Sequence, residues 1–264
     1  MARTAEDLKQ RIVDYYVATT ESSYLANWGG EALALHCGIA DESTASLSEA
    51  QNNTNAFLAE RVGIGPGTRV LDAGCGVGGS SIWLAQNRKA RVTGITIVGR
   101  QVELARKYAR ERGVEELVDF AEEDMLATSF PDASFDVVWN LESMCHVAVL
   151  QDYLPEVQRL LRDHGRLVVI DPCRGPSPHA ALEETLCLGW ALPPLRRPAD
   201  VAAALAAHGF ADIEQEDLGP LMERSNQALE AQASRSLLVL RAEQAFAGAA
   251  PEPETTAAPR TALR

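Results

Sequence analysis

A glycine-rich turn between two apolar runs, within residues 69–85 (RVLDAGCGVGGSSIWLA), constrains the fold most. The run before the turn predicts a short buried strand, and the run after it predicts a helix that begins at about Gly79. Gly74, Gly76 and Gly78 have no side chain, so the backbone can approach a ligand more closely than any Cβ would permit. The free N–H groups at the helix start would point at the same ligand. The stretch therefore predicts a strand–turn–helix unit that binds a ligand at the turn.

The spacing Gly74-x-Gly76-x-x-Gly79 also fits the fingerprint of dinucleotide-binding proteins. That fingerprint expects an acidic residue about 20 residues further on, to bind a ribose hydroxyl, whereas this chain has the sequence GITI at 94–97. Asp72, just before the glycines, would repel a pyrophosphate and attract a ligand that carries an ammonium and a sulfonium. These residues favour S-adenosylmethionine over a nicotinamide or flavin cofactor. A cap in an ordinary loop is the alternative for Asp72.

Composition narrows the class of protein. The 264 residues are 46% hydrophobic and 23% charged, as expected for a globular protein with one domain and a lid. No apolar run reaches the length of about 18 residues that a membrane span needs, no signal segment is recognised, and the five cysteines show no paired spacing, which predicts a cytoplasmic protein. A formal net charge of −13 disfavours a nucleic-acid partner. We expect a small-molecule substrate, and the composition leaves a homo-oligomer open.

The first part of the chain predicts helices without strands. Residues 5–28 place apolar side chains at mostly helical spacing, and a second helix is expected over about 48–62. Neither segment fits a doubly wound sheet. Residues 1–64 are therefore predicted to form a helical cap over the site.

From Thr68 onward, short apolar runs alternate with longer amphipathic segments, which is typical of a parallel sheet covered on both faces. Strands are expected at 69–72, 91–95, 117–121, 135–139, 166–171, 211–217 and 235–241. Helices are expected at about 79–87, 99–112, 150–162, 179–189 and 198–208. The predicted fold class is α/β, with a doubly wound, mostly parallel seven-stranded sheet, an N-terminal helical cap and an inserted lid.

The ligand-binding domain is predicted to span residues 65–246. It contains a Pro- and Gly-rich break that predicts a lid at about 173–197. Residues 247–264 are rich in Ala, Pro, Thr and Glu and lack a core-forming pattern, so we expect a disordered tail.

Polar residues follow the carboxyl ends of the predicted strands, where ligands bind in an open α/β sheet. Thr96 ends the second strand and Gln101 lies one turn into the next helix, so both can bind ribose hydroxyls. After the third strand, Asp124 can accept a hydrogen bond from an adenine amino group while Met125 packs on the ring. A solvated helix residue is the alternative for Gln101, and an acidic solvent-facing turn is the alternative for Asp124.

The fourth predicted strand leads into Asn140, Glu142 and His146, which are expected to face the pocket. Glu142 or His146 can serve as a base. With an alkene acceptor, the base would remove a proton from the carbocation that methyl transfer leaves. With a hydroxyl or amine acceptor, it would take the acceptor's own proton. A structural role at a helix start is the alternative for His146.

Several stretches together resemble the class I S-adenosylmethionine-dependent methyltransferases: VLDAGCGVGG at 70–79, GITI at 94–97 with Gln101, EDM at 123–125, FDVVW at 135–139 and LESMCH at 141–146. Within that family, the sequence is most similar to the C-methyltransferases that act on sterol side chains and to their relatives that act on tocopherol precursors and prenyl diphosphates. Tyr24, Trp28 and His36 resemble the aromatic N-terminal element of this group. The resemblance covers roughly residues 12–172. It is specific for the cofactor and much less specific for the acceptor.

The resemblance implies a Rossmann-like methyltransferase fold and the following roles. Gly74 and Gly76 would seat the methionine part of the cofactor, with Asp72 and Asn140 beside it, Thr96 and Gln101 would contact the ribose, Asp124 and Met125 would contact the adenine, and Tyr16 and Trp28 would line the methionine end. Thr96 departs from the commonest class I pattern, which has an acidic residue there, but the sterol-like branch tolerates the change. Substrate-binding candidates are Tyr24, His36, Arg174, Arg196 and Arg197.

We therefore predict an S-adenosylmethionine-dependent methyltransferase that transfers a methyl group to carbon of an isoprenoid or other unsaturated acceptor in specialised metabolism. A prenyl diphosphate acceptor would require clustered cations, usually with Mg²⁺, and Arg174, Arg196 and Arg197 are the candidates. No metal is expected otherwise. The alternatives are an O- or N-methyltransferase of a small natural product and a methyltransferase-fold binding protein without catalysis.

Overall fold

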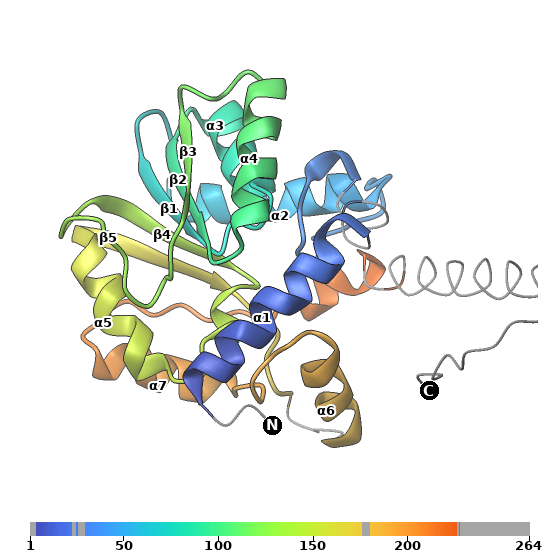
Figure 1. Ribbon diagram of the computed structural model, residues 1–264, viewed down its shortest axis with the longest axis vertical. Helices are drawn as coiled ribbons and strands as arrows, with labels where there is room; N and C mark the ends of the chain where they lie inside the picture. Colours follow the sequence, from blue (N-terminus) through green and yellow to red (C-terminus); the bar gives the residue numbers. More distant parts are fainter. Residues whose placement is uncertain (1–3, 23–24, 26–29, 176–179, 226, 228–264) are drawn as a thin grey trace, which may run out of the picture. The chain divides into compact units, whose positions relative to one another are not determined.

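The computed structural model describes residues 4–22, 25, 30–175, 180–225 and 227, and those up to 225 belong to one compact unit. A parallel sheet in the order β3-β2-β1-β4-β5 lies at its centre (Figure 1). The strands are β1 (Arg69–Ala73), β2 (Arg91–Thr96), β3 (Val118–Glu122), β4 (Phe135–Leu141) and β5 (Leu161–Ile170). The order reverses direction between β1 and β4, which makes their carboxyl ends the expected place for a ligand.

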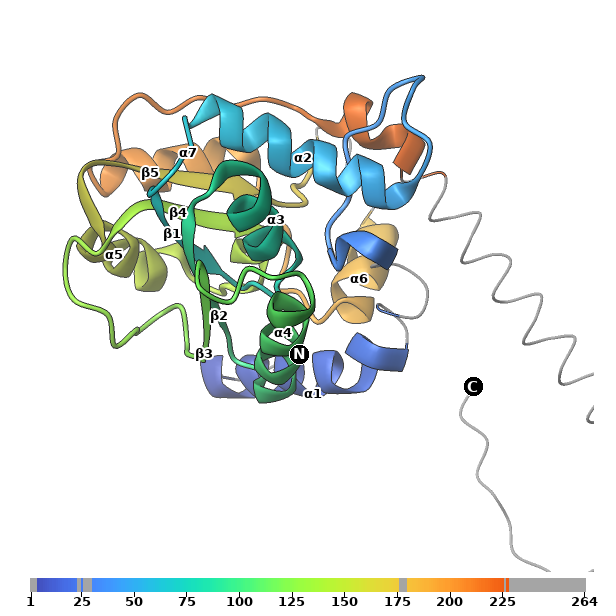
Figure 2. The same ribbon diagram turned by 90° about the horizontal axis from the view of Figure 1, so that it is seen from above.

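Helices cover the sheet on both faces, as Figures 1 and 2 show. One hydrophobic cluster contains the sheet and the helices α2 (Leu47–Arg61), α3 (Gly79–Arg88) and α4 (Gly99–Glu111). A second cluster contains the sheet, α5 (Leu150–Leu160) and α7 (Pro198–Ala207). The remaining elements are α1 (Ala5–Thr19), α6 (Ala180–Gly189) and the 3-10 turns η2 (Gly30–Ala32) and η3 (Met144–His146).

Consecutive apolar residues of the central strands fill both clusters. Val70 and Val137 belong to the cluster with α3, whereas the next residues, Leu71 and Val138, belong to the cluster with α5. Because successive side chains of a strand point to opposite faces, only an unbroken apolar run can occupy both. This explains why these strands are continuous apolar runs in the sequence.

The glycine turn joins β1 to α3 at close quarters. Gly78 has a φ of +87° at the N-cap of α3, and a Cβ there would lie 2.8 Å from the Cζ atom of Phe120. The conformation and the contact both demand glycine. The turn therefore brings the start of α3 against β3, and a side chain at this position would open the cluster.

The first five predicted strands are confirmed in place, and the parallel α/β sheet with them. The helix predicted over 150–162 ends at Leu160, because Leu161 already pairs with Phe135 as the start of β5. Residues 211–217 form no strand, and the strand predicted at 235–241 lies outside the described residues. Seven strands are therefore not confirmed, and the predicted disordered tail also falls outside the described residues.

The N-terminal segments are helical, as expected. The helix α1 ends at Thr19, whereas the predicted helix extended to residue 28, partly outside the described residues. The domain boundaries predicted at residues 64 and 246 stay predictions. In the described part of the chain, no helix combines the length and apolar character that a membrane crossing requires.

Replacing Leu154 by alanine tests the cluster around α5. Leu154 is 0% exposed, so Leu154→Ala should leave a cavity and lower the free energy of unfolding by about 2–5 kcal/mol. Leu182→Ala on α6 is the matched control, because Leu182 is 69% exposed and its truncation should change the free energy by less than about 0.5 kcal/mol. Urea denaturation measures both, and equal losses would contradict the assignment of the core.

Candidate active site

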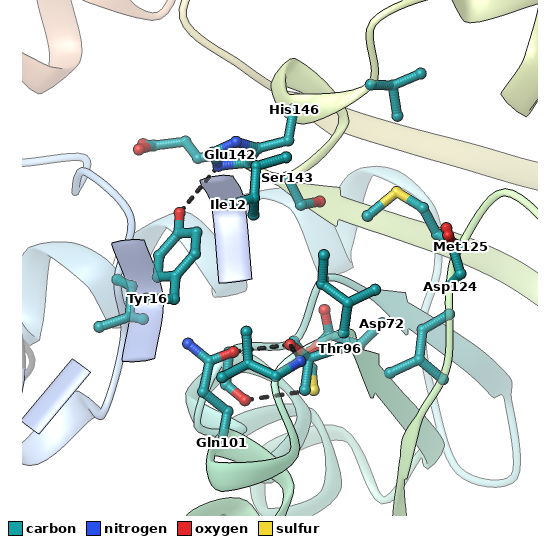
Figure 3. Close-up of a pocket in the computed structure, with 18 of the residues that line it drawn as sticks. Ile12, Tyr16, Asp72, Thr96, Gln101, Asp124, Met125, Glu142, Ser143 and His146 are labelled. Carbon is teal, nitrogen blue, oxygen red and sulfur yellow. Dashed lines mark hydrogen bonds between the residues drawn. The ribbon is translucent and has the colours of Figure 1, made fainter. Parts of the chain in front are cut away.

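A cavity of about 250 Å³ lies at the carboxyl edge of the sheet, lined by α1, the segment 33–36, the glycine turn and the ends of β2 and β4 (Figure 3). Most of the predicted site residues line it: Tyr16, His36, Asp72, Gly74, Gly76, Thr96, Gln101, Asp124, Met125, Glu142 and His146. These residues come from distant parts of the sequence. The fold therefore brings the sequence-predicted site together at one place.

Asp72 lies next to the end of β1 and is 3% exposed. Its carboxylate accepts a hydrogen bond of 2.6 Å from Ser81 Oγ, and no ion pair reaches it among the described residues. Burial raises the pKa of Asp72 to about 6, against the lowering effect of Ser81. A buried carboxylate that lacks a cation suits the ammonium group of a ligand.

The glycines of the turn are required by protein packing as well as by a ligand. Gly74 has a φ of +93°, and a Cβ there would lie 2.4 Å from the Cβ of Ser143. Gly76 has a φ of +54°, and its Cβ would lie 3.2 Å from Leu35 in the segment before α2. The turn is thus held between the end of β4 and the N-terminal segment.

Thr96 and Gln101 meet in a buried series of hydrogen bonds. Thr96 Oγ1 donates to Gln101 Oε1 at 2.7 Å, and Gln101 Nε2 donates to Oγ1 of Thr20 at 3.1 Å. Thr20 is 2% exposed and follows directly on α1. The two predicted ribose contacts are therefore joined to each other and to the N-terminal helix.

The residues predicted to bind the adenine also contact α1. Asp124 Oδ2 lies 2.9 Å from Nζ of Lys9, and Oδ1 accepts a hydrogen bond from the backbone N–H of Leu126. The ion pair raises the pKa of Lys9. Met125 lies beside Asp124 and faces the cavity in Figure 3. Asp124 and Met125 therefore both line the cavity, and their contact with an adenine stays a prediction.

At the opposite end of the cavity, Tyr16 and His146 point toward each other (Figure 3). The Tyr16 hydroxyl lies 2.9 Å from Nε2 of His146, and the rings meet edge to face with centroids 5.5 Å apart. Burial lowers the pKa of His146 to about 4 and raises the pKa of Tyr16 well above its usual value. Both side chains are therefore neutral at pH 7.

Glu142 lies directly after β4 in a left-handed conformation, with a φ of +50°. Its N–H donates to the carbonyl of Ile170 at 2.6 Å, and its Oε1 accepts a hydrogen bond of 2.7 Å from the N–H of Cys37. Burial raises the pKa of Glu142 to about 7, although the Cys37 bond lowers it. A non-glycine residue held in this conformation often marks a functional site.

His36 is buried and anchors the segment that covers the glycine turn. Its Nδ1 lies 2.8 Å from the carbonyl of Cys37, which requires a proton on Nδ1, so Nε2 accepts from Ser80 Oγ at 3.3 Å. Burial lowers the pKa of His36 to about 4. His36 therefore lines the cavity as a neutral group with both nitrogens engaged.

Asn140 does not line the cavity, in contrast to its predicted cofactor role. It is fully buried, and its Nδ2 donates to the carbonyl of Ala73 at 3.0 Å and to Ser143 Oγ at 2.9 Å. Its Oδ1 accepts a hydrogen bond of 2.8 Å from the Tyr153 hydroxyl. Both polar atoms of the Asn140 side chain are thus paired, and they link β4 to the end of β1, to Ser143 and to α5.

The three candidate arginines are absent from the cavity lining. Arg174 forms an ion pair of 2.5 Å with Glu183. The guanidinium of Arg196 donates to two backbone carbonyls of the segment 144–147, and Arg197 is exposed at the N-cap of α7. In the described ranges, they do not form a cluster of free cations at the site.

Two predicted residues, Tyr24 and Trp28, lie outside the described residues. Four contributors were missed from the sequence: Lys9, Thr20, Leu35 and Ser143. Ser143 lies inside the quoted stretch LESMCH and was available as a polar residue after a strand. The others carry no local signal, because their contacts depend on where the N-terminal segments cross the sheet edge.

No group of three or more His, Cys, Asp or Glu side chains suited to a metal ion occurs in the part of the chain that the structure describes.

Comparison with known proteins gives the site its context. Residues 71–169 match the family described as "Methyltransferase domain". The chain is 40% identical over 156 residues to 27-O-demethylrifamycin SV methyltransferase of Amycolatopsis mediterranei, covering 59% of this chain and 56% of that protein. It is 37% identical over 145 residues to geranyl diphosphate 2-C-methyltransferase of Saccharopolyspora erythraea, covering 54% and 49%. The chain spans about half the length of the curated relatives it matches.

Solved structures agree with this result. A geranyl diphosphate methyltransferase in complex with S-adenosylmethionine superposes with a TM-score of 0.64 and 26% identity, over 71% of this chain and 83% of that protein. The [4+2]-cyclase SpnF superposes with a TM-score of 0.73 and 24% identity, over 89% and 83%, and shares the fold. The predicted resemblance to S-adenosylmethionine-dependent methyltransferases is confirmed, since residues 71–169 match a methyltransferase domain and a similar solved structure holds S-adenosylmethionine.

Proposed function

We propose that the protein is an S-adenosylmethionine-dependent methyltransferase that acts on a small molecule, with carbon of an isoprenoid or other unsaturated compound as the acceptor. The cavity is the observation that carries this proposal. It brings together the glycine turn, the residues predicted to bind the ribose and the adenine, and a buried carboxyl group that can act as a base, and most of these lie within the matched domain. The five free cysteines of the described residues support a reducing cytoplasm.

The lining fits the parts of the cofactor. Asp72 would hold the ammonium group, Gln101 would contact the ribose, and Asp124 with Met125 would hold the adenine. When bound, the cofactor supplies a methyl group that its sulfonium already activates. The protein's own task is to orient the acceptor in line with that methyl group and to exclude water.

Glu142 is the base in this proposal. Its Oε1 is held by the N–H of Cys37, which leaves Oε2 for a proton, and a pKa of about 7 suits a general base near neutral pH. His146 is the weaker base, since its pKa is about 4 and its Nε2 is bonded to Tyr16. His146 and Tyr16 would instead shape the acceptor end of the cavity.

With an alkene acceptor, the π electrons would form the new C–CH₃ bond as the methyl–sulfur bond breaks and S-adenosylhomocysteine leaves. Oε2 of Glu142 would then take the proton on the carbon next to the cation, and the electrons of that C–H bond would form a new double bond. Oxygen methylation is the second candidate, favoured by the 40% identity to the rifamycin methyltransferase. There the hydroxyl proton would pass to Glu142. A diphosphate acceptor would need Arg174 or Arg196 to leave its present partner, and Mg²⁺ would enter only with such an acceptor.

Cofactor binding is tested by isothermal titration with S-adenosylhomocysteine and S-adenosylmethionine. The wild type should bind both, and Gly76→Val should abolish binding, because a side chain at a φ of +54° intrudes on the turn and on Leu35. Gly65→Val is the control, since nothing lies within 4 Å of a Cβ there. Absence of wild-type binding at millimolar ligand, with an intact circular dichroism spectrum, would refute the proposal.

The affinity for S-adenosylhomocysteine should depend on pH through Asp72. The ligand's ammonium needs an ionised carboxylate, and the raised pKa of about 6 means that protonation competes as the pH falls below 6. We expect constant affinity above pH 7 and about tenfold weaker binding at pH 5. Asp72→Asn should bind weakly throughout and lose this dependence. A wild-type affinity that stays flat from pH 5 to 8 would show that Asp72 does not meet the ammonium.

Glu142→Gln separates carbon from heteroatom transfer. The glutamine carbonyl can still accept the hydrogen bond from Cys37, so cofactor binding should be unchanged while turnover falls by about 10²-fold or more. Carbon transfer predicts regioisomeric or water-quenched products in the residual activity, whereas oxygen transfer predicts one product and an upward shift of the pH optimum.

The acceptor for this test comes from mass spectrometry of prenyl diphosphates, sterols, phenols and amines with labelled cofactor. Wild-type turnover by Glu142→Gln, with one unchanged product, would show that Glu142 is not the base. Cofactor binding without turnover of any acceptor would favour a binding protein on the methyltransferase fold.

A further inference from the structure

The orientation of the Gln101 amide is determined by its neighbours. The Thr20 hydroxyl has one proton, which it donates to the carbonyl of Tyr16 at 2.6 Å, so toward Gln101 it can only accept. The atom of Gln101 that faces Thr20 must therefore be the amide nitrogen, at 3.1 Å. On the other side, the Thr96 hydroxyl donates to Gln101 Oε1 and accepts from the N–H of Val98 at 3.2 Å.

Among the described residues, this arrangement leaves one N–H of Gln101 without a hydrogen-bond partner. The amide nitrogen carries two protons, of which Thr20 takes one, and the side chain lines the cavity while only 2% of the residue is exposed. A rotated amide would place its oxygen against the Thr20 oxygen and leave two acceptors facing each other. The second N–H of Gln101 is therefore available to a hydroxyl oxygen in the cavity.

We propose that Thr20, at the end of α1, is a positioning residue that holds the Gln101 amide so that its second N–H binds a ribose hydroxyl of the cofactor. This inference rests on the proposed function. Thr20 acts through Gln101. The conformation of α1 affects the position of the Thr20 hydroxyl, because this hydroxyl donates a hydrogen bond to the Tyr16 carbonyl one turn earlier. The N-terminal helix thus lines the cavity and also favours a ligand with a ribose hydroxyl over one without it.

The experiment compares S-adenosylhomocysteine with its 2′-deoxy and 3′-deoxy analogues by isothermal titration. The wild type should prefer the ribose form over at least one analogue by about tenfold, the effect of one buried hydrogen bond. Thr20→Val should lower the affinity for the ribose form about tenfold and change the affinity for that analogue by less than about twofold, so that the preference disappears. Thr20→Ser should restore the preference, because the serine hydroxyl can both accept and donate.

Thr19→Val is the matched control. Thr19 Oγ1 donates to the carbonyl of Tyr15 at 2.7 Å, the same type of bond on the same helix, whereas the amide nitrogen of Gln101 bonds to Thr20 instead. This variant should keep the wild-type preference. In a Gln101→Ala background, which should itself lack the preference, Thr20→Val should have no further effect on it.

The outcomes separate this inference from the proposed function. Absence of wild-type binding to S-adenosylhomocysteine would refute the proposed function itself. Binding without preference for the ribose form would overturn the ribose contact of Gln101 and this inference with it. If Thr20→Val lowers the affinities for the ribose and deoxy forms equally, Thr20 has a merely structural role. The same holds if Thr20→Val leaves the preference for the ribose form unchanged. If Thr20→Val does not fold, Thr20→Ala takes its place. Loss of the preference in folded Thr20→Ala supports the inference, whereas a Thr20→Ala or Gln101→Ala preference equal to that of the wild type overturns it.

Discussion

The reversal of strand order between β1 and β4 is the constraint on which the site depends. The strand order reverses between them, so the helices that follow leave on opposite faces and a space opens at the edge. Asn140, which does not line the cavity, links the end of β4 to β1 and α5, since its amide bonds to Ala73, Ser143 and Tyr153. A buried amide with every polar atom paired is costly to disturb, because removal of one partner leaves the others unsatisfied.

Burial in the fold sets the protonation of the titratable groups around the cavity. The pKa values of the carboxyl groups of Asp72 and Glu142 rise to about 6 and about 7, and those of the imidazoles of His36 and His146 fall to about 4. Loss of water is the largest cause in all four cases. Burial, more than neighbouring charges, therefore sets the pKa values in the site. It gives Glu142 the pKa of a base that works near neutral pH.

The helix α1 and the residue that follows it line the cavity or contact its lining, and they reach each part of the proposed cofactor site. Lys9 of α1 reaches Asp124 at the adenine station, Thr20 beyond its end reaches Gln101 at the ribose station, and Tyr16 reaches His146 at the transfer end. The exposed Lys9 ion pair contributes little to stability. The buried contacts of Thr20 and Tyr16 carry more weight, because they orient side chains that face the cavity.

The elements of the sheet and the glycine turn were predictable from the sequence, and most of the site residues predicted from it line the cavity, including Asp72, Gln101, Asp124 and Glu142. Continuous apolar runs, glycine spacing and polar residues after strands are local signals, and parallel strands place such residues at one edge.

Hydrogen-bond partners and helix docking were decided only by the tertiary structure. Asn140 follows the pattern of a ligand contact yet binds backbone and Tyr153, while Arg174 is paired with Glu183. Thr20 gives no sign of its contact with Gln101, 81 residues away. The sequence by itself determined the sheet, the turn and the chemical groups at its edge, whereas the packing of α1 over that edge decided which of those groups remain free to bind a ligand.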